Sequence, residues 1–166
     1  MTSAASADSL QSSLGYRFKA LALLEEALTH SSLVNEQKTA SAQHNERLEF
    51  LGDAVLSLVM SEYLASALPQ SSEGTLSKLK AQVVSEASLA QVARRLGLGE
   101  HLKLGRGEAR SKGHEKDSLL ADALEAVLAA VHLDGGFEAS RMVTRHIFAE
   151  ELTHIAAQQE QPGAGD

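Results

Sequence analysis

Acidic side chains in two apolar segments are the residues of this chain best suited to chemistry. A helix advances about 100° per residue, so Glu46, Glu49 and Asp53 would share a sector of about 60° on one helix. Asp122 and Glu125 would share one face of another helix, because they are spaced i and i+3. For the first segment alone, an amphipathic helix that shows a charged face to water explains the pattern equally well.

The second segment argues more strongly for a bound cation. Apolar residues surround it on nearly all sides, which is typical of a buried helix. Burying two carboxylates without a partner costs several kcal/mol or forces them to take up protons. Arg or Lys from elsewhere, or a metal ion, would have to compensate, and no Lys or Arg lies between Asp117 and Leu133. We favour a metal ion over a structural ion pair.

The donor types narrow the choice of metal. The chain has no cysteine, and Glu49, Asp53, Asp122 and Glu125 would offer only hard oxygen ligands. Such ligands suit Mg²⁺ or Mn²⁺ rather than Zn²⁺. If the two acidic pairs face each other across a helix contact, they form a divalent-cation cage. One use of such a cage is phosphodiester hydrolysis.

Charge and composition limit the partners of the chain. The formal net charge is −7, but the stretch from Lys78 to Lys116 holds nine basic and four acidic residues. Charge alone favours an ordinary solvated surface over a nucleic-acid interface. No apolar run is expected to reach the length of a membrane span, and the lack of cysteine is compatible with a reducing compartment. We therefore expect a cytoplasmic protein without a membrane partner.

Apolar periodicity is helical throughout, which predicts an all-α fold of about seven helices. We expect one domain over residues 1–156, with an unstructured start over 1–9 and a disordered tail, or the start of a linker, over 157–166. Asn45 is the expected N-cap of the long helix. Helices are expected over residues 21–30, 45–68, 75–84, 86–96, 117–133 and 137–157, with a loop or short turns over 104–116.

The run Asn45–Leu56 resembles the signature of ribonuclease III nuclease domains. Leu120–Ala126 resembles the second acidic motif of that family, and Ser72–Gly74 its acidic turn. The resemblance extends from about residue 14 to about residue 151, and the two acidic motifs occur in the family's order. A twelve-residue signature together with a second motif is highly specific. The expected fold is therefore that of a ribonuclease III nuclease domain.

The resemblance assigns roles to individual residues. It implies that Glu49, Asp53, Asp122 and Glu125 ligate a catalytic Mg²⁺ or Mn²⁺, and that Asp53 and Glu125 are catalytic. Glu46 and Glu73 are counted with the catalytic residues, because the family places them in the same acidic valley, where they assist substrate or dimer contacts. Phe50 matches a ring that inserts into the partner subunit of a homodimer; without the resemblance we would expect a plain core aromatic. Gly52 would allow the close approach of another backbone, or be a tolerated helix glycine.

The activity that the resemblance implies is endonucleolytic cleavage of double-stranded RNA by metal-activated water. Products would carry 5′-phosphates and short 3′ overhangs, as in rRNA or mRNA processing. We expect no double-stranded RNA-binding domain in this chain and no small-molecule cofactor. A catalytically silent, dimeric RNA-binding or scaffold relative is the alternative. The seven histidines are expected to be surface or packing residues, and the expected phosphate contacts are Arg106, Arg110, Lys112 and Lys116.

Overall fold

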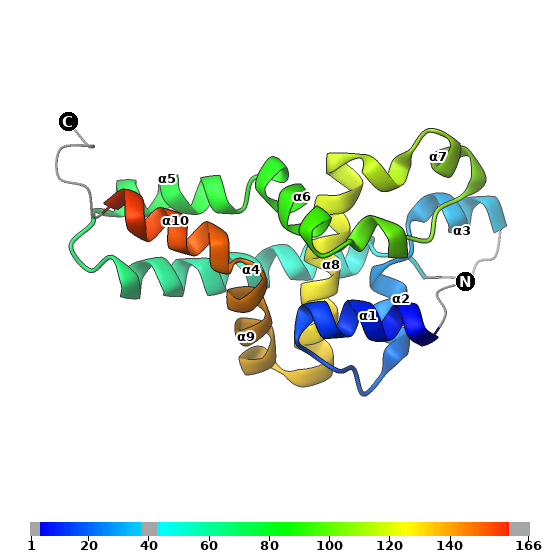
Figure 1. Cartoon of the computed structure of the whole chain (residues 1–166), viewed down its shortest axis with the longest axis horizontal. Helices are drawn as coiled ribbons and strands as arrows, with labels where there is room; N and C mark the ends of the chain where they lie inside the picture. The colour runs from blue at the N-terminus through cyan, green and yellow to red at the C-terminus, as the bar shows by residue number, and fades with distance from the viewer. Residues whose placement is uncertain (1–3, 38–42, 160–166) are drawn as a thin grey trace.

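Helices account for nearly all of the fold. The computed structural model describes residues 4–37 and 43–159, and within these ranges it has no named strand, only an isolated parallel bridge between Thr29 and Lys103. The prediction of an all-α fold is confirmed (Figure 1). The α-helices are α1 (Ala4–Leu14), α2 (Leu21–Ala27), α3 (Ser31–Gln37), α4 (Glu46–Ala67), α5 (Glu73–Val83), α6 (Glu86–Arg95), α7 (Arg106–Arg110), α8 (Asp117–Gly135), α9 (Phe137–Ile147) and α10 (Ala149–Gln159), with short 3₁₀ helices η1 (Leu98–His101) and η2 (Gly113–Glu115).

Helix α8 is the centre of the molecule. It is enclosed by α2, α4, α6 and α9, and its residues from Ala123 to Val131 are all buried (Figure 1). This is the all-round burial that its sequence predicted. Most of the buried residues are alanine, valine and leucine, whose short or compact side chains allow the neighbouring helices to pack closely. Asp122 and Glu125 therefore lie on the most enclosed helix of the fold.

Helices α4 and α8 cross in very close contact at Gly52. A Cβ atom built on Gly52 would overlap the carbonyl oxygen of Glu125, so only glycine allows the two backbones to approach this closely. This bears out the expectation that Gly52 permits a close approach of another backbone. Because Glu49 and Asp53 flank Gly52 along α4, the crossing brings them to the same place as the acids of α8.

Local signals in the sequence set most of the helix ends. The hydroxyl of Ser72 accepts a hydrogen bond from the Thr75 backbone N–H at 3.2 Å, and Ser85 caps α6 in the same way. Gly97 follows α6 with a φ of 69°, which ends the helix. Asn45 occupies the N-cap position of α4, but its side chain does not cap the helix. Instead its Nδ2 donates to the Ala27 carbonyl at 3.1 Å and ties α4 to α2.

Three parts of the chain differ from the expectation. The start is helical from Ala4, because Leu10 and Leu14 are fully buried against the core; the prediction of an unstructured segment over 1–9 was wrong there. Helix α3 was not predicted. The expected single last helix is broken at the fully buried Phe148, and α10 continues to Gln159. The expected tail beyond that point, residues 160–166, lies outside the described residues.

Helix α4 passes a length-and-composition test for a membrane span, contrary to the expectation. It has 22 residues and its most apolar window has a mean hydropathy of 1.3. Core helices of soluble proteins pass the same test, and this one begins with Glu46, Glu49 and Asp53 and packs on α8. The finding alone does not indicate a membrane protein.

The α4–α8 crossing gives a first prediction. Gly52→Ala should lower the free energy of unfolding by at least about 1–3 kcal/mol, because backbone atoms must move apart to admit the methyl group. Gly107→Ala is the matched control, since a Cβ there meets nothing within 4 Å. It should be neutral or slightly stabilising, because alanine has the higher helix propensity. Urea unfolding measures both, and equal stability of the two variants would contradict the close approach.

Candidate metal centre

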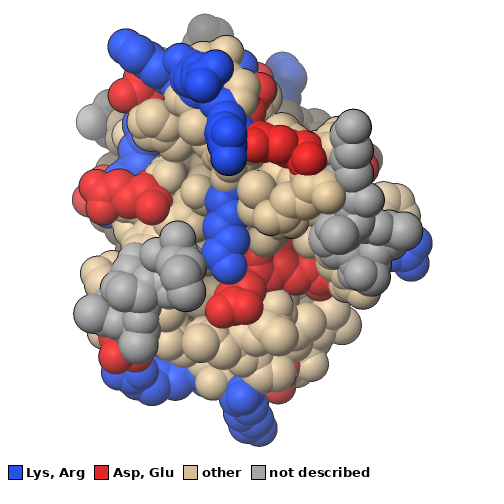
Figure 2. All heavy atoms as spheres, turned by 90° about the vertical axis from the view of Figure 1, so that its right-hand side faces the viewer, with Lys and Arg blue, Asp and Glu red and all other residues tan. Residues whose placement is uncertain are grey.

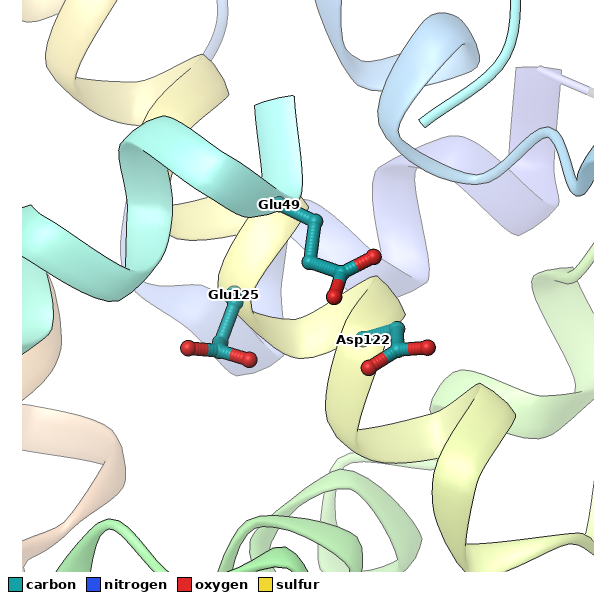
Figure 3. Close-up of side chains that lie close together, drawn as sticks. All are labelled: Glu49, Asp122 and Glu125. Atoms are coloured by element: carbon teal, nitrogen blue, oxygen red, sulfur yellow. The ribbon is translucent and has the colours of Figure 1, made fainter. Parts of the chain in front are cut away.

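Three carboxylates meet where α4 and α8 cross. Glu49 comes from α4, and Asp122 and Glu125 come from α8 (Figure 3). Each offers one oxygen, and these oxygens all lie within 4.8 Å of one another. The two acidic segments, separated by about 70 residues in the sequence, therefore converge as predicted. A divalent cation bound by oxygen ligands at about 2.0–2.6 Å can be shared by such a group.

Burial makes these carboxylates hard to ionise together. Glu125 is only 9% exposed, and its burial, a hydrogen bond with Asp53 and nearby negative charges raise its pKa to about 8. Burial, the charge of Asp122 and a hydrogen bond with Asp122 raise the pKa of Glu49 to about 7. Burial also raises the pKa of Asp122. The centre therefore concentrates negative charge in a place where water cannot fully solvate it.

In the part of the chain that the structure describes, no lysine or arginine pairs with the acids of the centre. Among the described residues, none of the salt bridges involves Glu49, Asp53, Asp122 or Glu125. Of the two compensations considered for the buried acids, an Arg or Lys is thus not the one used. A donor set made only of desolvated carboxylates fits Mg²⁺ or Mn²⁺. Bound there, such an ion would offset the burial and the mutual repulsion that raise these pKa values.

Asp53 and Glu46 lie at the solvent side of the same centre. Both are exposed, and together with Glu49, Phe50 and Glu125 they line a hollow on the surface. Asp53 lies close enough to Glu125 to help raise the pKa of that carboxyl, but it does not belong to the tight group of three oxygens. The hollow gives a ligand in solution direct access to the buried acids.

Comparison with known proteins decides the family. A model described as Ribonuclease-III-like matches residues 21–152, which include both acidic segments and most of the chain. This chain belongs to that family. The ribonuclease-III-like fold explains why the two motifs occur together: one supplies the acids of α4, and the other supplies those of α8.

Individual relatives agree with the family assignment. The curated Ribonuclease 3 of Caldanaerobacter subterraneus subsp. tengcongensis is 52% identical over 146 residues, covering 88% of this chain and 64% of the relative. The nuclease domain of ribonuclease III from Campylobacter jejuni superposes with a TM-score of 0.81 at 42% identity, covering 88% of this chain and 98% of that one. Dicer from Pichia stipitis, 24% identical with a TM-score of 0.62, shares the fold. The chain spans about three fifths of the length of the first curated relatives.

Within one chain, Glu73 lies away from the metal centre. It begins α5, which follows the C-terminal end of α4, whereas Glu49 lies in the first turn of α4 (Figure 1). The helix between Glu49 and Ala67 alone spans roughly 27 Å. The expectation of a common acidic valley is therefore met by Glu46 but not by Glu73 in the same chain.

Phe50 is not a core aromatic. Its side chain is 82% exposed, which removes the alternative that the sequence left open. It borders a groove that is also lined by Arg47, Leu51 and Leu133, and Leu133 is itself 55% exposed. Phe50, Leu51 and Leu133 thus form the apolar part of a groove whose other lining residues include Glu26, His44 and Glu46.

Two of the four residues expected to contact phosphates are already paired with acidic side chains. Arg106 pairs with Glu36 at 3.4 Å, and Lys116 pairs with Glu108 at 2.8 Å. Arg110 and Lys112 are exposed and form no salt bridge with the described residues. Figure 2 shows Lys and Arg side chains gathered on the upper part of the face nearest α7, and Asp and Glu side chains around a hollow below them. Basic and acidic regions thus adjoin on one side of the molecule.

His30 was expected to be a surface or packing histidine, and the structure places it directly before α3. Its ring is half-buried, and its Nδ1 accepts a hydrogen bond from the Ser32 backbone N–H at 3.1 Å. Its own backbone N–H donates to the Lys103 carbonyl at 3.0 Å.

The raised pKa values predict how stability depends on pH. Because Glu125 binds its proton more tightly in the folded protein than in the unfolded chain, stability should fall as pH rises from about 4.5 towards 8. Glu125→Gln removes this charge and should raise the free energy of unfolding at pH 8 without metal by about 1–3 kcal/mol. The gain should vanish near pH 4.

Thermal unfolding in EDTA at both pH values measures this effect. Glu25→Gln, an exposed glutamate of α2, is the matched control and should change stability little at either pH. Adding Mg²⁺ should stabilise the unaltered protein more than the Glu125 variant. A Glu125 variant that is less stable at pH 8 than the unaltered protein would show that the ionised Glu125 carboxylate does not destabilise the fold.

Proposed function

We propose that this chain is a nuclease domain that cleaves double-stranded RNA endonucleolytically with Mg²⁺ or Mn²⁺ as cofactor. The observation that carries the proposal is the convergence of Glu49, Asp122 and Glu125 at a half-buried centre that no lysine or arginine of the described residues neutralises. Membership of the ribonuclease-III-like family and the Ribonuclease 3 names of the relatives support the same activity.

The residues of the centre have two proposed roles, which are to hold the ion and to control how the RNA reaches it. Glu49, Asp122 and Glu125 would hold the ion, which when bound supplies a water of lowered pKa and stabilises charge on the phosphate. Asp53 lies beside Glu125 and lines the hollow, where its carboxylate could accept a proton from the attacking water. Glu46 lies at the rim of the hollow, where its negative charge would repel RNA phosphates and so restrict how they enter.

A homodimer would place two such centres on one duplex. Under a two-fold axis each centre can cut one strand, which yields the proposed 5′-phosphates and short 3′ overhangs. A role for Glu73 at the centre then requires a second copy of the chain, since its own centre is a helix length away. The structure of the Campylobacter jejuni domain is described as having a region involved in dimer formation.

Duplex contacts are proposed on the basic side of the molecule. Arg110 and Lys112 form no salt bridge with the described residues and are therefore the side chains most available to contact phosphates. Arg106 and Lys116 would first have to leave Glu36 and Glu108. A-form RNA is recognised largely through its shape, phosphates and 2′-hydroxyls, so little sequence preference is expected. Processing of rRNA or mRNA in the cytoplasm remains part of the proposal.

A catalytically silent RNA-binding or scaffold relative is the weaker candidate. Such a protein would gain stability by replacing Glu125, whose burial raises its pKa to about 8, with a neutral residue. The centre instead retains each acid that the family motif calls for. No observation in the structure favours loss of activity.

Cleavage of a duplex RNA tests the proposed activity. Glu125→Gln and Asp122→Asn should each reduce the cleavage rate in Mg²⁺ at least about 100-fold, equivalent to about 2.7 kcal/mol, because each removes an anionic ligand of the ion. Duplex binding in Ca²⁺ should be retained. Glu25→Gln is the control and should cleave normally. Full activity of the Glu125 variant, or full activity of the unaltered protein in EDTA, would contradict the metal centre.

Phe50 tests the proposed dimer. Phe50→Ala should shift the chain from dimer towards monomer at micromolar concentration, because it removes an exposed aromatic from the rim of the groove. Met142→Ala is a matched control, since Met142 on α9 is 64% exposed but does not line that groove. Analytical ultracentrifugation measures both. A dimer that is unchanged by Phe50→Ala but broken by Met142→Ala would place the interface on α9 instead.

A further inference from the structure

Side chains of α3 hold the start of helix α7. The backbone N–H of Arg106, the first residue of α7, donates to Glu36 Oε2 at 2.5 Å, and Arg106 Nε lies 3.4 Å from Glu36 Oε1. One residue earlier, the Gly105 N–H donates to Ser32 Oγ at 2.9 Å. Gly105 occupies the N-cap position of α7 and has no side chain to cap the helix. Glu36, on another helix, therefore provides the acceptor that an N-cap residue would ordinarily provide.

The contact between α3 and α7 is close on both sides of Gly105. A Cβ atom built on Gly105 would lie 2.6 Å from the Ser32 carbonyl oxygen and 2.7 Å from Glu36 Oε2. Before this point, the Lys103 N–H donates to the Leu28 carbonyl at 2.9 Å, which ties the segment that leads into α7 to the end of α2. The chain is thus fixed before α7 begins, and Glu36 then fixes the first residue of the helix.

The segment that follows α7 is fixed as well. Lys116 Nζ donates to Glu108 Oε1 at 2.8 Å, so the two ends of the turn between α7 and α8 are joined. A Cβ atom built on Gly113 would lie 2.6 Å from Glu108 Cγ, which shows how closely the turn packs on α7. Helix η2, within this turn, packs against α8, the helix that carries Asp122 and Glu125. Residues 105–116 therefore form a braced segment beside the metal centre.

Lys112 has a strained backbone in the middle of this braced segment. Its φ is 59°, and no other non-glycine residue in the described ranges has a positive φ. Its N–H donates to the Ala109 carbonyl at 3.1 Å, and its carbonyl accepts from the Glu115 N–H at 2.9 Å. A glycine would adopt this conformation at lower cost, and strained residues of this kind are concentrated at functional sites. The strain indicates that the exposed Lys112 side chain has a use.

We propose that Glu36 is a positioning residue for RNA binding, which holds α7 so that Arg110 and Lys112 meet backbone phosphates of a duplex beside the metal centre. Both cations are exposed, and neither forms a salt bridge with the described residues. Long side chains on a pre-ordered backbone bind more tightly, because less freedom is lost when the partner arrives. The inference rests on the proposed function, but it concerns duplex binding, which can be measured in Ca²⁺ without cleavage.

Duplex RNA binding by the whole chain in Ca²⁺, measured by fluorescence anisotropy at low salt, tests the proposal. Glu36→Ala should raise the duplex dissociation constant roughly tenfold. Glu36→Gln should bind within about twofold of the unaltered protein, because its amide oxygen still accepts from the Arg106 N–H and the exposed ion pair contributes little. Both variants lose the same negative charge, so the difference between them reports the position of α7. Glu150→Ala is the matched control, since it removes an exposed glutamate that pairs with Arg95, and it should bind normally.

A double-mutant cycle shows whether Glu36 acts through the two cations. In a chain that already carries Arg110→Ala and Lys112→Ala, adding Glu36→Ala should change the affinity for duplex by less than about twofold. The Mn²⁺ affinity of Glu36→Ala without RNA should equal that of the unaltered protein, because the metal centre keeps all its acids. Lys112→Gly should weaken duplex binding without lowering the melting temperature, because glycine relieves the backbone strain.

Three results would overturn the positioning role of Glu36. Tighter duplex binding by Glu36→Ala would show that Glu36 instead keeps Arg106 away from RNA. Equal losses in Glu36→Ala and Glu36→Gln would assign the effect to charge, and equal losses with and without Arg110 and Lys112 would assign it to the fold as a whole. The predicted pattern of binding in a protein that cleaves no duplex in Mg²⁺ would support the positioning role and contradict the proposed activity alone.

Discussion

The structure depends on one electrostatic constraint, which is that carboxylates from two helices are held together in a place where water solvates them poorly. The constraint arises at the α4–α8 crossing, where Gly52 lets one backbone pass against the carbonyl of Glu125. Raised pKa values at Glu49 and Glu125 express its cost in the metal-free protein. A protein that keeps such a cost has a use for the site, and a bound dication offsets the cost directly.

The remaining elements serve to keep these acids in place. Arg94 of α6 binds both Asp117 and the Glu115 carbonyl, which fixes the first turn of α8. At the other end of α8, Asp134 accepts hydrogen bonds from the Tyr16 hydroxyl and from the backbone N–H groups of Lys19 and Ala20. Helix α8 is thus anchored at both ends, so the acids in its middle have little freedom to separate from those of α4.

The sequence predicted the helical class and the centre because both depend on local patterns. Spacing placed Glu49 with Asp53 and Asp122 with Glu125, and the apolar surroundings of Glu125 showed that it must be buried. The sequence was less informative where tertiary contacts determine the conformation. Asn45 donates a hydrogen bond to α2 rather than capping its own helix. The expected last helix is interrupted at Phe148, whose side chain is fully buried in the core. Glu73 could not be placed relative to the centre, because its distance from the centre follows from the packing of whole helices.

Diffraction from crystals of the protein grown with Mn²⁺, with data collected to record the anomalous signal of manganese, would test the central claim most directly. A metal centre at this crossing would give an anomalous peak between Glu49, Asp122 and Glu125, with carboxylate oxygens at about 2.2 Å. In Glu125→Gln crystals the same peak should be weak or lost. Full occupancy at a different place, with these three carboxylates unliganded in a protein that cleaves RNA, would contradict the account.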